Sequence, residues 1–169
     1  MLVADHEPAG AAAKDMSRRF DVDMSTGRTF DFVHFDSSGG SPSWLVFSRT
    51  NGLLGDHAIL RGRDSTEQVR RVVSYTGQSL QGPPNSVSLL RLDEKAFDIL
   101  GPRRELPGTG RSQGIALELG RGRVVILGEA AMLTAQVTDN GRLRFGMNRP
   151  GSDDRQFALN VMRWLGRGL

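Results

Sequence analysis

The sequence predicts a three-layer α/β domain built around a mostly parallel β-sheet. The strongest signal is a buried strand that leads directly into a helix. Four consecutive apolar residues, Val124 to Leu127, are followed by Gly128 at a turn and by a helix-favouring run that starts at Glu129. A second strand-turn-helix sequence opens the chain, and an amphipathic helix closes it. Strands that alternate with helical segments are typical of α/β domains.

The N-terminal part supplies one such unit and then weaker signals. Met1 to Asp5 is predicted to be a short apolar strand. Pro8 can occupy the first turn of a helix, and apolar residues recur at helical spacing from there to Phe20. Three phenylalanines between residues 30 and 35 indicate extended structure, and Trp44 to Ser48 is predicted to be a compact strand.

The later elements follow from capping, turn and periodicity signals. Residues 56 to 62 form an irregular segment whose Ile59 and Leu60 are expected in the core. The remaining predicted elements are a short helix that begins with the capping box Ser65–Gln68, strands at Val72–Tyr75 and Val87–Leu92, a mobile loop at Gly101–Ser112, an antiparallel hairpin at Ile115–Leu127 turning at Gly120–Gly122, a helix at Glu129–Gln136 and a closing helix at Asp153–Leu165.

Composition narrows the class of protein. With 169 residues, 38% hydrophobic and 24% charged, the chain has the size and composition of one globular domain. Because it contains no cysteine, disulfides, thiolate metal sites and a cysteine nucleophile are excluded. The net charge is +3, and 22 residues are basic, of which all but Lys14 and Lys95 are arginine. The arginines are scattered along the chain, so we do not expect nucleic-acid binding.

Targeting signals are missing from the sequence. No apolar run reaches the roughly 18 residues of a membrane span, and no charged segment precedes an apolar one as in a signal peptide. The chain opens abruptly on the apolar stretch Met1–His6, as an internal strand of a larger domain would. We therefore expect further sequence upstream, which would carry any targeting signal. The sequence assigns neither a compartment nor an oligomeric state.

Several short motifs point to a family. Three segments resemble parts of trehalose-utilisation (ThuA-like) proteins, which are class I glutamine amidotransferase-like. Asp56–Gly62 resembles their "D-H-P-I-T-x-G" segment, Leu119–Gly128 resembles their last hairpin, and Met1–His6 resembles their strand after "G-G-G". A bacterial branch of this superfamily carries further motifs, which are matched here by Ala4–Pro8, Tyr75–Gln78, Gly128–Gln136, Gly146–Pro150 and Asn160–Leu165. The resemblance implies one flavodoxin-like domain over residues 1–169 that lacks its first βα unit.

The chain departs from that family at its catalytic residues. Amidotransferases use a cysteine nucleophile in the turn after a strand, with a histidine and a glutamate near the last strands. The nucleophile position falls here around Asp5 and His6, and Glu129 stands where the histidine would be. The resemblance therefore implies a domain without amidotransferase activity.

Asp5, His6 and Glu129 are the candidate catalytic residues. Asp5 and Glu129 each follow a predicted strand, and the carboxyl ends of parallel strands meet at one edge of the sheet, where ligands bind. Two carboxylates and a histidine can bind a metal ion or act as acid and base, although the sequence identifies no particular metal or cofactor. The alternative is that these acids only cap helix N-termini.

Gln136, Asn148 and His57 are the candidate ligand-binding residues. Gln136 and Asn148 can hydrogen-bond a neutral polar ligand, and Asp56 can orient the imidazole of His57. Buried amides more often tie loops to the backbone, and the Asp56–His57 pair also fits a structural turn. His34, which lies among phenylalanines, is interpreted as structural.

Two classes of function follow. The favoured one is a domain that binds a small polar ligand, such as a sugar or a carboxylate, without catalysis. Its rival is a hydrolase that uses Asp5, His6 and Glu129, with or without the help of a metal ion.

Overall fold

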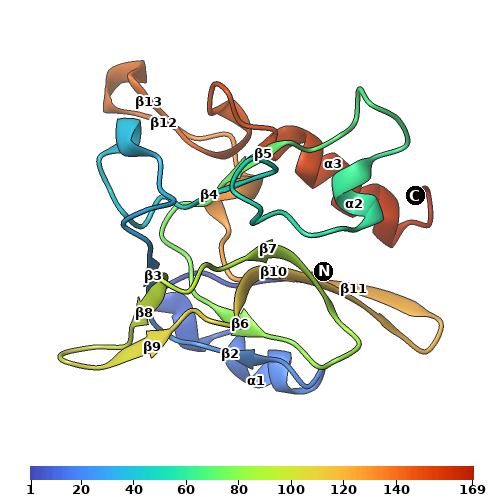
Figure 1. Cartoon of the computed structure of the whole chain (residues 1–169), viewed down its shortest axis with the longest axis horizontal. Coiled ribbons are helices and arrows are strands. Elements are labelled where there is room, and N and C mark those ends of the chain that lie inside the picture. The colour runs from blue at the N-terminus through green and yellow to red at the C-terminus, as the bar shows by residue number, and fades with distance from the viewer.

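A mixed β-sheet forms the centre of the computed structural model (Figure 1). The structure describes the backbone of residues 1–169 and every side chain except that of residue 139. Strands follow the order β1-β11-β10-β6-β2, and β7 also pairs with β10. These strands are β1 (Leu2–Val3), β11 (Gly122–Leu127), β10 (Ser112–Leu119), β6 (Leu80–Gln81), β2 (Asp23–Met24) and β7 (Val87–Arg91).

The β10–β11 hairpin is the longest pairing, and it confirms the hairpin that was predicted from the sequence. Its antiparallel register runs from Gly114 against Leu127 to Leu119 against Gly122. Gly120 occupies the turn with a φ of 56°, a left-handed conformation that glycine adopts without strain. The apolar run of β11 is thereby fixed inside the sheet, between β1 and β10.

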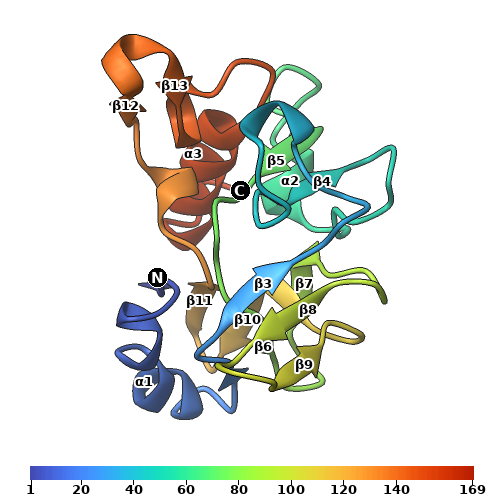
Figure 2. The ribbon, with the colours of Figure 1, turned by 90° about the vertical axis from the view of Figure 1, so that its left-hand side faces the viewer.

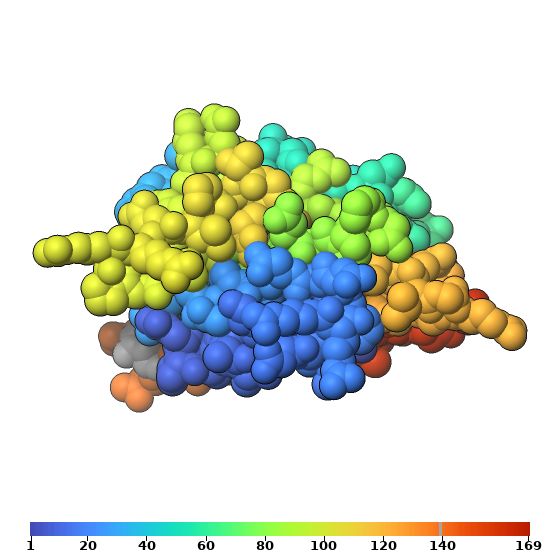
Figure 3. All heavy atoms as spheres, turned by 90° about the horizontal axis from the view of Figure 1, so that it is seen from below, coloured from blue at the N-terminus to red at the C-terminus, as the bar shows by residue number. Residues whose placement is uncertain are grey.

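Alternate residues of the hairpin enter two different cores. Ile115 and Ile126 pack with Ala13 and other apolar residues from the N-terminal segment, while Ala116 and Val125 belong to the larger cluster on the other face. The N-terminal segment includes α1 (Lys14–Arg18), and the opposite face is covered by α2 (Ala58–Arg61) and α3 (Asp154–Leu165). Figure 2 shows α1 and α3 on opposite sides of the sheet, and Figure 3 shows the N-terminal segment spread over the lower face.

Three smaller antiparallel sheets complete the fold. They are β3 (Arg28–Phe30) with β8 (Phe97–Ile99) and β9 (Glu105–Pro107), β4 (Val46–Ser48) with β5 (Arg71–Val73), and β12 (Val137–Thr138) with β13 (Leu143–Arg144). Buried Asp98 joins the first to the main sheet, because its carboxylate accepts hydrogen bonds from Thr29 Oγ1 (2.6 Å) and Ser79 Oγ (2.7 Å). Single 3₁₀ turns occur at Ala9–Ala11, Ser37–Gly39, Ala131–Leu133, Asp139–Gly141 and Gly146–Asn148.

The predicted three-layer, mostly parallel α/β sheet is wrong. Strands account for 28% of the chain and helices for 21%, and the main sheet is mixed and curled. Among the strand pairs described, β1 with β11 is parallel and the others are antiparallel. The physical reason is the connections: parallel neighbours need a crossover of a dozen or more residues, usually helical, whereas most connections here are turns and irregular loops.

Two predicted helices are much shorter than expected. The helix predicted from Pro8 to Phe20 is a 3₁₀ turn and then α1, and Met16, on its expected apolar stripe, is 51% exposed. Gly10, the central residue of this 3₁₀ turn, has a low helix propensity, and a Cβ at this position would lie 2.9 Å from the Thr26 carbonyl oxygen. The helix predicted at Glu129–Gln136 is the 3₁₀ turn Ala131–Leu133, because the backbone becomes extended at Thr134.

Other local predictions had mixed outcomes. The capping box at Ser65–Gln68 does not begin a helix; instead, α2 forms in the segment expected to be irregular, with Ile59 and Leu60 buried as predicted. Residues 101–112, expected to be a loop, contain β9 and the start of β10. Strands β4, β5 and β7 and helix α3 confirm their predictions, with shifted ends.

Candidate functional site

The prediction that Asp5 and Glu129 share one edge of the sheet agrees with the structure. Strands β1 and β11 are parallel, with Val3 against Leu127, and the Ala4 amide donates to the Leu127 carbonyl at 2.8 Å. Asp5 and Glu129 follow these two strand ends. The negative charge of Asp5 reaches Glu129 and contributes to raising the pKa of its carboxyl.

Glu129 is buried and held by backbone. Its side chain is 0% exposed, and its carboxylate accepts hydrogen bonds from the amides of Ala131 and Met132, the latter at 2.8 Å. Burial raises the pKa of Glu129 to about 8, against the lowering effect of these amides. The Glu129 side chain thus ties down the 3₁₀ turn that follows it, and burial favours its protonated form at neutral pH.

Asp5 and His6 are more accessible than Glu129. Their side chains are 48% and 31% exposed, and His6 Nε2 lies 3.8 Å from Asp5 Oδ1. His6 Nδ1 is 2.6 Å from the carbonyl oxygen of Glu7, to which it can donate. Among the described residues, Asp31, His34 and Asp93 bring their ligand atoms together closely enough for one metal ion, whereas Asp5, His6 and Glu129 do not.

The three predicted ligand-binding residues do not form one site. Gln136 is exposed and donates to Thr134 Oγ1 at 2.9 Å, and Asn148 lies in the 3₁₀ turn after β13. His57, at the start of α2, lines a hollow together with Val87 and Trp164. Of the three, His57 alone therefore borders a cavity described here.

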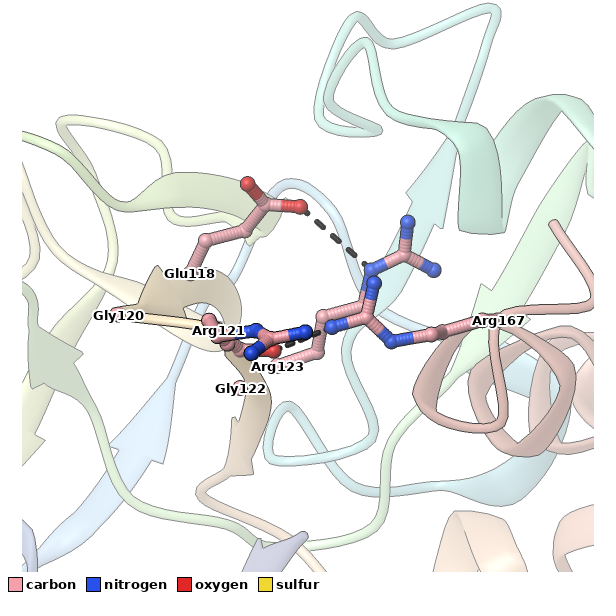
Figure 4. A pocket seen from close by; sticks show the side chains of 6 residues that line it. All are labelled: Glu118, Gly120, Arg121, Gly122, Arg123 and Arg167. Carbon is pink, nitrogen blue, oxygen red and sulfur yellow. Dashed lines mark hydrogen bonds and ion pairs between the residues drawn. The ribbon is translucent and has the colours of Figure 1, made fainter.

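Two hollows meet where the β10–β11 hairpin approaches the end of α3. They have volumes of about 520 and 390 Å³ and share Glu118 as a lining residue. The larger is lined by Glu118, Gly120, Arg121, Gly122, Arg123 and Arg167, and the smaller by His57, Asn85, Val87, Ala116, Leu117, Glu118 and Trp164. We call the two together the hairpin groove; Figure 4 shows three guanidinium groups gathered at its larger part.

The three arginines of the hairpin groove are held to different degrees. Arg123 Nη1 donates to the carbonyl oxygens of Trp164 (2.7 Å) and Leu169 (3.0 Å), and its guanidinium lies 5.0 Å from the Trp164 ring centre. Arg167 donates to the backbone carbonyl of Arg121. In the described part of the chain, no hydrogen bond or ion pair engages the exposed Arg121 guanidinium. The larger hollow therefore has three positive side chains against one carboxylate, that of Glu118.

His57 adds a neutral donor to the same groove. Burial, with help from the charges of Arg61 and Arg123, lowers the pKa of His57, so the ring is neutral at pH 7. Its Nδ1 accepts the Ile59 amide at 3.2 Å, which places the ring proton on Nε2. The ring also contacts Trp164 edge-on, with centroids 4.9 Å apart.

Sequence reasoning missed the arginines of this groove. The run Gly120-Arg121-Gly122-Arg123 was interpreted only as a turn, and the arginines as a whole were judged scattered. Arg167 lies 44 positions after Arg123, so the two meet only because α3 packs on the sheet. The one local signal was the pair of arginines at a hairpin turn, where side chains are exposed.

Comparison with known proteins yields a fold and no family. No family model matches the chain, and no curated protein does. A solved structure titled "mmIFT52 N-terminal domain" is similar, with a TM-score of 0.57 and 14% sequence identity over 90% of this chain. The chain spans 56% of the length of that relative, and at this identity the likeness shows the fold alone.

These findings overturn the resemblance drawn from the short motifs. With no matching family and with a mostly β-stranded structure, the assignment to class I glutamine amidotransferase-like, ThuA-like or flavodoxin-like proteins is wrong. Motifs of four to ten residues, each common by itself, misled the prediction. The absence of a membrane span has better support: within the described residues, no helix combines the length and apolarity needed to cross a bilayer.

Proposed function

We propose that this protein binds a small carboxylate ligand in the hairpin groove, without a chemical step. The observation that carries the proposal is the gathering of the Arg121, Arg123 and Arg167 guanidinium groups around a hollow of about 520 Å³ (Figure 4). A guanidinium presents a planar fork of donors that matches a carboxylate and forms charge-assisted hydrogen bonds with it. The hollow has the size of a small-molecule site.

The three arginines would contribute to ligand binding in different ways. Arg123 is fixed by two backbone carbonyls and by the Trp164 ring, so it provides a rigid wall with positive charge. Arg121 and Arg167 are exposed and project from the hairpin turn and from the segment after α3. They can close on a ligand from two sides, and the His57 Nε2 proton offers a further donor in the adjoining hollow.

The test uses citrate as the probe and compares two matched double variants. Isothermal titration calorimetry should show saturable one-to-one binding of citrate that weakens as salt increases, since exposed charges are screened. Arg121→Ala with Arg167→Ala should lower the affinity by about tenfold or more, because charge-assisted hydrogen bonds are lost. Arg18→Ala with Arg19→Ala removes two exposed arginines at the end of α1, which do not line the hairpin groove, and should leave binding nearly unchanged.

Three outcomes would contradict the proposal. Equal losses in both double variants would mean that citrate responds to net charge and not to this groove. Absence of saturable citrate binding would exclude a carboxylate. If glucose bound instead and did so independently of salt, the ligand would be a neutral sugar.

A second candidate, hydrolysis at Asp5, His6 and Glu129, has one specific observation in its favour. Glu129 is a buried acid whose pKa is raised to about 8 with a contribution from the charge of Asp5, and such perturbed acids are frequent in active sites. A protonated Glu129 would serve as general acid and the Asp5–His6 pair as base. Turnover of p-nitrophenyl acetate that is abolished in Asp5→Asn and in His6→Gln would support it; equal rates in all three proteins would reject it.

A further inference from the structure

A second cluster of ionisable side chains lies away from the hairpin groove, at the end of β3. Asp31 follows β3 directly, His34 lies three residues later, and Asp93 belongs to the loop between β7 and β8. Strand β3 pairs with β8, with Phe30 against Phe97, and this pairing brings the end of β3 beside that loop. The ligand atoms of the three residues all lie within 4.8 Å of one another.

Asp31 is the fixed member of this cluster. Its side chain is only 3% exposed, and Oδ1 accepts the amides of Val33 (2.7 Å) and His34 (3.0 Å). The other oxygen, Oδ2, lies 3.1 Å from His34 Nδ1. The turn therefore presents one carboxylate oxygen and one imidazole nitrogen side by side, with the carboxylate held in place by the backbone.

These distances suit a shared cation. Oxygen and nitrogen ligands bind zinc at about 2.0–2.2 Å, so two ligands of one ion lie about 3.0–3.5 Å apart. The separation of 3.1 Å between Asp31 Oδ2 and His34 Nδ1 falls within this interval. Asp93 is half-buried, and among the described residues its carboxylate accepts one hydrogen bond, from the amide of its near neighbour Lys95 to Oδ1 at 3.0 Å. A small side-chain rotation can therefore bring it to the ion.

From this geometry we infer that Asp31, His34 and Asp93 bind a divalent first-row transition-metal ion, such as Zn²⁺. An imidazole together with two carboxylates favours zinc or manganese over magnesium, which keeps to oxygen ligands. Three protein ligands leave at least one coordination position for water, because zinc takes four or more ligands. The site is independent of the proposed function, since none of its residues lines the hairpin groove.

The surroundings leave this site open to solvent. Phe32 and Val33, which lie between the two ligands in sequence, are 64% and 53% exposed. Phe32 stacks on Phe97, with ring centroids 6.2 Å apart, and so holds the turn from outside. The ion would be reached from solvent without any opening of the core.

The first experiment measures zinc affinity directly. Metal-free protein is titrated with ZnCl₂ in competition with a chromogenic chelator, alongside His34→Ala, Asp93→Asn and His6→Ala. His6 is the matched control because it is also a partly exposed histidine beside an aspartate. One equivalent of zinc should bind to the wild type and to His6→Ala. Loss of a ligand should weaken binding by about tenfold or more, since even the loss of a residue that hydrogen-bonds a ligand costs about 10–100-fold.

The second experiment guards against unfolded variants. Asp31 is buried and ties two amides, so Asp31→Asn is uninformative, whereas Asp93 lies on a loop and its substitution should leave the fold intact. Zinc should raise the unfolding temperature of the wild type, EDTA should reverse the rise, and Asp93→Asn should show no rise. Unchanged zinc affinity in both His34→Ala and Asp93→Asn would overturn the inference, and so would equal loss in His6→Ala.

Discussion

The two ends of β11 differ in almost every physical respect. At its carboxyl end, Glu129 is fully buried and both of its oxygens accept backbone amides. At its amino end, Gly122 opens into the hairpin groove, where the guanidinium groups of Arg121 and Arg167 are exposed. The carboxyl end is a closed structural junction, and the amino end is an open, positively charged surface.

This difference teaches where a ligand can be recognised. A residue that stands out in the sequence is not available to bind a ligand when backbone amides already satisfy its polar atoms, as for Glu129. Residues at a plain hairpin turn gain importance when another element, here the end of α3, brings like charges beside them. Such a concentration of charge has an electrostatic cost that a bound anion would relieve.

The largest expected effect concerns the closed end. Burial raises the pKa of Glu129 from 4.5 to about 8, so the unfolded chain ionises first as pH rises. Stability contributed by this group is therefore present below about pH 4.5 and is lost as pH increases towards 8. Glu129→Gln should remove this loss, so the variant should gain a few kcal/mol relative to wild type between about pH 5 and about pH 9.

Urea unfolding of wild type and Glu129→Gln at about pH 5 and about pH 9 measures this change in the free energy of unfolding. Glutamine has a single side-chain acceptor, so the variant should be less stable than wild type at the lower pH by about 1–2 kcal/mol. Asp15→Asn, which alters an exposed carboxylate on α1, is the control and should show no such swing. A constant difference between Glu129→Gln and wild type at both pH values would mean that Glu129 is ionised in the folded protein.

Matched glycines at the two ends of the strand give the next largest effect. A Cβ at Gly128 would lie 2.0 Å from the Gln78 carbonyl oxygen, whereas at Gly122 the nearest atom is the Leu119 carbonyl oxygen at 3.3 Å. Gly128→Ala should therefore destabilise the fold by about 3 kcal/mol, and Gly122→Ala by less than about 1. Thermal unfolding of the two variants checks this; similar losses would show that the closed end can shift to make room.

The smallest expected effect is a change in citrate affinity on substitution of Glu118, the carboxylate of the hairpin groove. Its Oε1 lies 3.5 Å from Arg123 Nε and its side chain is 68% exposed, so the pair contributes little to stability. Removing the negative charge by Glu118→Gln should strengthen citrate binding by less than about fivefold. Calorimetry measures the citrate affinity of this variant, with Glu105→Gln on β9 as the distant control. Weaker citrate binding in Glu118→Gln would show that Glu118 holds Arg123 in its binding position.

Local features of the fold were predictable, and the arrangement of the strands was not. The β10–β11 hairpin and α3 carry strong turn and periodicity signals, and both formed where expected. Whether β1 and β11 lie in a parallel or an antiparallel sheet depends on all the connections between them. Short apolar runs such as Val124–Leu127 have the same appearance in either arrangement. The sequence therefore identified strands without fixing their order.

The candidate site illustrates the same limit. The shared edge of Asp5 and Glu129 followed from two strand ends, but the Asp56–His57 pair fitted a structural turn better than a ligand site, and the place of His57 at a cavity was not predicted. Arg167 and Arg123 were beyond prediction because their proximity arises from the packing of α3 on the sheet. His34 was interpreted as structural because its phenylalanine neighbours are visible in the sequence, while Asp93, far along the chain, is not adjacent to it.

The two-residue strand β1 also has a consequence for the order in which the protein is made. Leu2 pairs with Ile126, so the partner of this strand is synthesised 124 positions later. At the usual 5–20 residues per second, β1 waits roughly 6 to 25 seconds for that partner. The main sheet can therefore be completed only after Ile126 has been synthesised, and until then Leu2 and Val3 are available to a chaperone.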